Sequence, residues 1–104
     1  MNYPEQREYE RSPSDIAVTI HQRGKMIPAT IIDISRRGIG LLSEERILLG
    51  SKIQTTFTHT EGYAIGGTAE WAMLISAEKK FHYRTGIRAD KFLDPKDILG
   101  NAYS

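Results

Sequence analysis

Apolar and polar residues alternate along most of this chain, which is the pattern of strands with one buried face. In residues 16–20, for example, Ile16, Val18 and Ile20 take one side of such a strand. Segments with this alternation, or with the β-branched composition of strands, follow at 26–34, 38–43, 53–57, 63–75 and 81–89. The pattern therefore predicts six strands.

Glycines mark the places where these strands are expected to turn or bend. Gly24 predicts a turn between the first two strands, and Gly50-Ser51 predicts a break before the fourth. Gly66-Gly67 lies inside the longest segment and predicts a bulge or sharp bend, which a small closed barrel needs. Trp71 shares the parity of the apolar residues in that segment, so we expect it in the core.

The two ends of the chain differ from the middle. Asp94-Pro95 predicts a helix start, because aspartate caps a helix N-terminus and proline suits the first helical position. Gly100 is expected to end this helix after one or two turns, so that it closes one mouth of the fold. Residues 1–14 contain Pro4, Pro13 and many charges, and we expect them to form a flexible N-terminal arm.

These elements predict an all-β domain over residues 15–104, with six antiparallel strands and a short C-terminal helix. A chain of 104 residues is long enough for one domain and too short for two. Short turns between strands favour a small barrel or sandwich. A closed barrel is favoured over a sandwich, because closure removes the exposed sheet edges of a chain so rich in β-forming sequence.

The composition excludes several classes of function. The chain has no cysteine, so it forms neither a disulfide nor a thiolate site. No apolar run approaches the roughly 18 residues of a membrane span, and the N-terminus lacks a signal pattern. We therefore expect a cytoplasmic protein without membrane insertion. The net charge of +1 gives no general attraction to a nucleic acid polymer.

Two short polar motifs carry the candidate chemistry. Arg7 and Arg11 form an Arg-x-x-x-Arg pair in the arm, and guanidinium groups suit phosphates and the acceptor edge of guanine. The second motif, Asp33-x-Ser35-x-x-Gly38, closes an apolar run. It places a carboxylate, a hydroxyl and a glycine on a turn, which suits the donor edge of a base. Together the motifs indicate a site for a small guanine nucleotide.

Asp33 needs a specific reason to lie within the run Ile31-Ile32-Asp33-Ile34, because a buried carboxylate is costly unless it accepts hydrogen bonds. The N1–H and N2–H₂ groups of guanine would satisfy both of its oxygens. The alternative is a simple hairpin turn, since aspartate, serine and glycine are common turn formers. Arg84 and Arg88 repeat the arginine spacing inside a predicted strand, so an isolated pair of this kind is interpreted as surface charge.

The order of the motifs within a β-only domain resembles the PilZ domain family, from about Gln6 to about Phe92. The resemblance implies a six-stranded antiparallel β-barrel that binds cyclic di-GMP, a bacterial second messenger. Carried over by position, Arg7 and Arg11 would contact the phosphates and the acceptor edges of guanine. Asp33 would accept hydrogen bonds from one guanine, Ser35 would bond nearby, and Gly38 would allow close approach of the backbone.

The resemblance also suggests secondary ligand contacts. Trp71 stands where the family often has an aromatic residue beside the ligand, which is the alternative to a core position. Arg36 and Arg37 depart from the smaller residues common between the serine and the glycine, and either add phosphate contacts or face solvent. Gln6 stands where many members have another arginine, which leaves open one or two ligands per chain, and a monomer or a ligand-linked dimer.

The resemblance implies a receptor whose arm becomes ordered on the ligand and forms a surface for an unidentified downstream protein. The first alternative is a PilZ-like protein-interaction module that does not bind the nucleotide. The second alternative is a β-barrel that binds single-stranded nucleic acid. Such a barrel would need a basic groove with exposed aromatic residues. An enzyme is not expected, and neither a cofactor nor a metal, because His21, His59 and His82 are dispersed and Ser35 has no histidine motif to activate it.

Overall fold

The computed structural model describes residues 12–58, 60–77 and 80–103. It contains six strands followed by one helix, as the alternation predicts. The elements are β1 (Ser12–Gln22), β2 (Lys25–Ile34), β3 (Gly38–Ser43), β4 (Lys52–Phe57), β5 (Thr60–Ala77), β6 (Lys80–Ala89) and α1 (Pro95–Tyr103).

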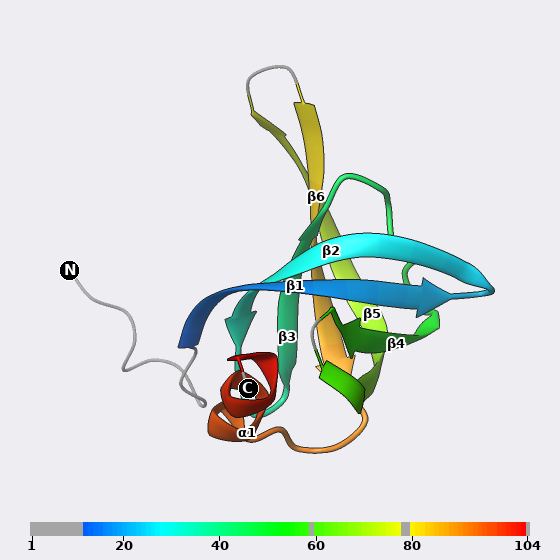
Figure 1. The fold of residues 1–104 in the computed structure, drawn as a ribbon. Coiled ribbons are helices and arrows are strands. Elements are labelled where there is room, and N and C mark those ends of the chain that lie inside the picture. Colours follow the sequence, from blue (N-terminus) through cyan, green and yellow to red (C-terminus); the bar gives the residue numbers. More distant parts are fainter. Residues whose placement is uncertain (1–11, 59, 78–79, 104) are drawn as a thin grey trace.

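The six strands close into an antiparallel barrel in the order β1-β2-β3-β6-β5-β4 (Figure 1). The barrel closes where β1 pairs with β4, with Val18 opposite Phe57 and His21 opposite Gln54. The expectation of a six-stranded antiparallel barrel is confirmed. The hairpin of β5 and β6 is longer than its neighbours and projects from one end of the barrel (Figure 1).

The core is built from the inward residues of the alternating strands, and isoleucine dominates it. On β1, Ile16, Val18 and Ile20 are all buried. The β1–β2 turn uses Arg23 and Gly24, both at positive φ (53° and 78°), which matches the twist of the two strands. The remaining buried apolar side chains are Ile27, Ala29, Ile31, Ile34, Ile39, Leu41, Ile47, Ile53, Phe57, Ile65, Ala69, Ile87 and Ile98.

The bulges of the barrel lie elsewhere than the glycines suggest. In the β5–β6 pair the register shifts between Ala69 and Trp71, which makes Glu70 the extra residue. Of the two alternatives expected at Gly66-Gly67, the bulge is wrong, because both glycines pair in regular register with Gln54 and Ile53 on β4, and the sharp bend stays a prediction. Gly67 instead allows β5 to lie close to β6, because a Cβ at that position would lie 2.6 Å from the carbonyl oxygen of Arg88. A second shift, between Ile31 and Asp33, makes Ile32 the extra residue in the β2–β3 pair.

Strand β1 begins at Ser12, so residues 12–14 of the expected arm belong to a strand. Ser12 lies opposite Ile34 and Pro13 lies opposite Asp33. The rest of the expected arm, residues 1–11, lies outside the described residues. The chain therefore enters the described barrel directly beside the Asp-x-Ser-x-x-Gly motif.

Helix α1 lies at one end of the barrel, as expected (Figure 1), but it continues past Gly100 to Tyr103, so the expected stop at Gly100 is wrong. Asp94 caps the helix, because its Oδ1 accepts a hydrogen bond of 3.0 Å from the backbone N–H of Lys96. Ile98 is 0% exposed and belongs to the core cluster. The hydroxyl of Tyr63 on β5 donates to Oδ2 of Asp97 at 3.4 Å. Burial, and then the charge of Asp97, raises the pKa of Tyr63.

Within the described part of the chain, no helix has the length and apolar character needed to cross a membrane.

We predict that Ile98→Ala lowers the free energy of unfolding by about 2–5 kcal/mol, because it leaves a cavity where the helix meets the core. Gly100→Ala is the control on the same helix: an added Cβ there meets no atom within 4 Å. It should raise stability by about 0.5–1 kcal/mol through helix propensity. Urea unfolding measures both. Equal, small effects would show that α1 is not part of the cooperative fold.

Candidate functional site

The segment Ser35–Gly38 forms a closed turn between β2 and β3. The N–H of Ser35 donates to the carbonyl of Gly38 at 2.9 Å, and the N–H of Gly38 donates back to Ser35 at 3.3 Å. The hydroxyl of Ser35 also donates to the carbonyl of Gly38, at 3.4 Å, and Ser35 is only 8% exposed. In this structure the serine shapes the turn, so a contact of Ser35 with a ligand stays a prediction.

Gly38 is required by packing between strands. A Cβ at Gly38 would overlap the carbonyl oxygen of Ile87 on the neighbouring strand β6. The glycine therefore lets β3 pair closely with β6, in the register that places Gly38 opposite Arg88. The predicted close approach of a ligand to Gly38 remains a separate prediction.

The bulge at Ile32 explains why an aspartate lies within an apolar run. Ile31 pairs with Leu41 and Asp33 pairs with Gly40, so the alternation advances by one residue at the bulge. Asp33 consequently points to the outer face of the barrel while Ile31 and Ile34 both stay buried. Its side chain is still only 13% exposed. The carboxylate is thus held at the surface without being fully solvated.

The bulge at Glu70 does the same for Trp71. Ala69 pairs with Ile87 inside the barrel, whereas Trp71 pairs with Gly86 on the outer face. Trp71 is 41% exposed, so the expectation of a core tryptophan is wrong. The alternative, that this aromatic ring is placed for a surface ligand, agrees with its position and remains a prediction.

Register brings Asp33, Gly40, Gly86 and Trp71 into one row across β2, β3, β6 and β5. We call these four residues the Asp33–Trp71 row. A Cβ at Gly40 would lie 2.8 Å from Oδ1 of Asp33, and a Cβ at Gly86 would overlap the indole ring of Trp71. The carboxylate and the indole therefore lie over the two glycines from opposite sides. The row presents an acceptor group next to an aromatic surface.

Both arginines of the second Arg-x-x-x-Arg pair form ion pairs on this face. Nη2 of Arg84 lies 3.1 Å from Oδ2 of Asp33, and Nε of Arg88 lies 2.5 Å from Oε2 of Glu70. The shared face was predicted, but the role of Arg84 as a partner of Asp33 was missed. The one available signal was that a carboxylate in an apolar run needs a donor somewhere in the chain.

Arg36 and Arg37 are exposed at the tip of the turn, beside the end of β6. Their guanidinium carbons lie 5.4 and 5.7 Å from the centre of the Phe92 ring, within the range of a cation–π contact. Their carbonyls accept hydrogen bonds from the N–H groups of Leu93 (2.7 Å) and Ala89 (2.9 Å), respectively. The turn is therefore fixed to the last residue of β6 and to the segment that follows it, with both cations at the surface.

Gln6, Arg7 and Arg11 lie outside the described residues, so their predicted roles remain predictions. The start of the described chain lies close to Asp33. Pro13 lies opposite Asp33 at the start of β1. Ser12, the first described residue, lies opposite Ile34, so β1 begins beside one end of the row.

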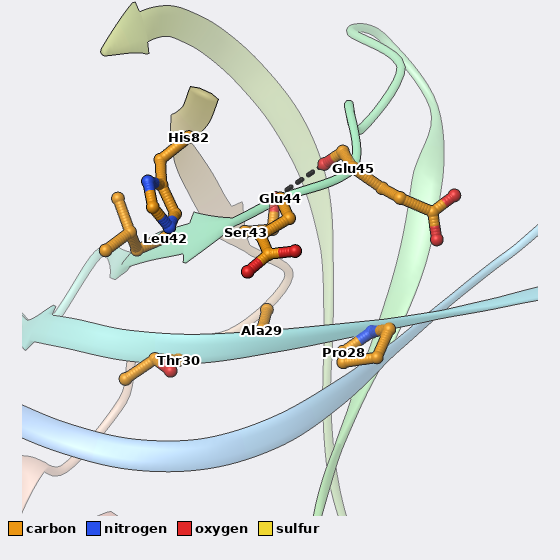
Figure 2. Close-up of a pocket in the computed structure, with 8 residues that line it drawn as sticks. All are labelled: Pro28, Ala29, Thr30, Leu42, Ser43, Glu44, Glu45 and His82. Atoms are coloured by element: carbon orange, nitrogen blue, oxygen red, sulfur yellow. Dashed lines mark hydrogen bonds between the residues drawn. The ribbon is translucent and has the colours of Figure 1, made fainter. Parts of the chain in front are cut away.

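A cavity of about 430 Å³ lies where β2 and β3 separate beyond the pair Thr30–Leu42 (Figure 2). Figure 2 shows the carboxylate of Glu44 directed toward β2 and the imidazole of His82 beside Leu42. The hydroxyl of Ser43 donates to the carbonyl of Glu45 at 2.6 Å. The cavity is lined by Pro28, Ala29, Thr30, Leu42, Ser43, Glu44, Glu45 and His82.

Two carboxylates in the lining make this cavity a poor place for a phosphate, because like charges repel at close range. The pair Leu42–Arg84 separates it from the Asp33–Trp71 row. The arginines of the turn and of β6 favour the row for an anionic ligand. No group of three or more metal-binding side chains was found among the described residues.

The sequence model of the PilZ domain family matches residues 5–70 of the 104. The chain belongs to the PilZ domain family. The matched range contains both polar motifs. Two members of the Asp33–Trp71 row, Trp71 and Gly86, follow its end, and so does Arg84, the partner of Asp33. No curated protein matched the sequence.

Among solved structures, the fold is similar to that of the PlzA protein of Borreliella burgdorferi, determined in complex with c-di-GMP. The TM-score is 0.67 at 10% sequence identity, and the alignment covers 96% of this PilZ chain and 51% of the PlzA chain. The chain thus spans about half the length of that relative. At this identity the likeness shows a shared fold.

We predict that Gly86→Ala displaces the indole of Trp71, since the new methyl group would occupy its place. Trp71 is the one tryptophan of the chain, so its fluorescence reports on the row directly. Emission should shift to longer wavelength as the ring becomes more solvated. Ala64→Ser, an exposed change on β5, is the control. An unchanged spectrum in a folded Gly86→Ala protein would contradict the described position of the ring.

Proposed function

We propose that this PilZ domain is a receptor for cyclic di-GMP, bound on the outer face of the barrel at the Asp33–Trp71 row. The observation that carries the proposal is the row itself. Two bulges turn a carboxylate and an indole outward at one level, and each lies over one of the two glycines between them. The solved c-di-GMP complex of PlzA, which shares the fold, supports the choice of ligand.

The chemistry of the row fits a guanine base. The N1–H and N2–H₂ groups of guanine are neighbouring donors, and the carboxylate of Asp33 offers two acceptors to meet them. The exposed indole of Trp71 offers an aromatic surface on which a base can stack. Adenine presents an acceptor at N1, which a carboxylate repels. Asp33 should therefore select guanine over adenine.

The arginines supply the charge that two phosphates need. Arg36 and Arg37 are exposed on the turn, and Arg7 and Arg11 precede the point where β1 starts opposite Asp33 and Ile34. We propose that the segment carrying Arg7 and Arg11 contacts the phosphates and becomes ordered on the ligand. Ordering costs free energy, so we expect an affinity of roughly micromolar, about −8 kcal/mol.

The ordered segment and the ligand would together form a new surface, through which we propose that the domain signals to another protein. Binding rather than catalysis is the proposed role. One observation favours the alternative function, a protein-interaction module that does not bind the nucleotide. The projecting β5–β6 hairpin carries exposed Met73 and Leu74, which follow Trp71 along β5 and suit contact with a protein.

We predict that Arg11→Ala abolishes measurable binding of cyclic di-GMP while leaving the thermal midpoint of the free protein nearly unchanged. The residue is assigned to the ligand, so its loss removes charge-assisted hydrogen bonds to phosphate. Isothermal titration measures the affinity, with cyclic di-AMP as the control ligand. Arg46→Ala, on the exposed loop between β3 and β4, is the charge-matched control. Absence of heat with the unmodified protein would favour the interaction module.

We predict that Asp33→Ala weakens cyclic di-GMP binding by about ten- to a hundredfold, the range expected for hydrogen bonds to a charged group. It should also reduce the preference over cyclic di-AMP. Asp90→Ala is a matched control, because Asp90 likewise lies over a glycine, Gly66, and is paired with Lys52 at 2.6 Å. Equal losses in the two variants, or an unchanged preference, would show that Asp33 does not contact the base.

A further inference from the structure

Arg84 occupies the acceptor that the proposed function assigns to guanine. Its Nη2 lies 3.1 Å from Oδ2 of Asp33, and the two residues are 51 positions apart in the chain. The side chain of Asp33 is 13% exposed, so little of it is accessible to solvent. Leu42 lies opposite Arg84 in register, which places the guanidinium one step along β6 from Gly86 and the row.

The arginine and the base present the same chemistry to Asp33. A guanidinium group offers neighbouring N–H donors, and the donor edge of guanine, N1–H with the amino group on C2, is itself part of a guanidine unit. Each satisfies a carboxylate with two parallel hydrogen bonds when the geometry allows. Arg84 and a guanine base are therefore competitors for one acceptor.

The Asp33–Arg84 pair is incomplete, which makes it easy to replace. A fork-to-fork arginine pair would use two donors, whereas the structure shows one bond, from Nη2. Nε of Arg84 is buried and has no hydrogen-bond partner. The side chain as a whole remains 41% exposed. Moving the guanidinium into solvent would let water satisfy its Nε, which offsets part of the bond that Arg84 loses to Asp33.

We propose that Arg84 is a placeholder for guanine: in the ligand-free domain its guanidinium occupies Asp33, and a bound guanine displaces it. Arg84 is then a positioning residue that sets the affinity of the site, because only the fraction of molecules in which Arg84 has left the carboxylate is ready to bind. The inference rests on the proposed cyclic di-GMP function and adds to it the residue that regulates access to Asp33.

The placeholder role predicts tighter binding when the competitor is removed. Arg84→Met keeps the length of the side chain and removes its donors. Arg88→Met is the matched control, since Arg88 lies on the same strand and face, is paired with Glu70 instead, and carries the same charge. Any general loss of attraction for an anionic ligand is then common to both variants.

Isothermal titration with cyclic di-GMP should give Arg84→Met about three- to tenfold higher affinity than Arg88→Met, as expected if Arg84 has left the carboxylate in about a third to a tenth of the molecules. The affinity of Arg84→Met for cyclic di-GMP should also exceed that of the unmodified protein. In an Asp33→Asn background, which removes the carboxylate charge, the same Arg84 substitution should have little effect. Arg84→Lys keeps the positive charge but lacks the paired donors of a guanidinium group. Its affinity should lie between those of the unmodified protein and Arg84→Met.

Equal affinities of Arg84→Met and Arg88→Met, or weaker binding by Arg84→Met, would overturn the placeholder role while leaving the receptor function standing. A merely structural role for Arg84 would not tighten binding. If neither the unmodified protein nor Arg84→Met binds, the proposed function itself fails, and the inference fails with it. Binding by Arg84→Met alone would support the placeholder and show that it blocks the site.

Discussion

The outer face of this barrel depends on two β-bulges. In a closed sheet every strand alternates between core and solvent, so a residue can change sides only where an extra residue is inserted. The insertions at Ile32 and Glu70 bring Asp33 and Trp71 out of an otherwise apolar sequence and into the same row. Without them both strands would carry these side chains into a core that has no partner for a carboxylate. The candidate site is therefore a product of register.

Glycines in the row provide the space that the two outward side chains occupy. Gly40 and Gly86 are central in the row and let the carboxylate and the indole lie against the sheet. Gly38 belongs to the scaffold, because its absent side chain lets β3 approach Ile87. Charge then divides the surface: the arginines surround the row, whereas Glu44 and Glu45 line the cavity beyond Leu42. The charges would attract an anionic ligand to the row and repel it from the cavity.

Much of the fold could be predicted because one buried face imposes a period of two on the strands. The same rule failed at Trp71, since a bulge is decided by pairing with another strand and has no clear local signal at Glu70. Arg84 was missed for a similar reason: its partner is 51 positions away, and spacing within a strand says nothing of contacts across the sheet. The motif at Asp33 could be recognised locally, whereas its surroundings depend on β5 and β6.

The order of the strands gives the row one more property. Its members come from β2, β3, β5 and β6, and contacts between distant segments form slowly in folding, because closing long loops costs entropy. The row is complete only when the last strand has joined the sheet. A ligand held there would bind the native barrel and no shorter folding intermediate, so its binding free energy would be added to the stability of the whole domain.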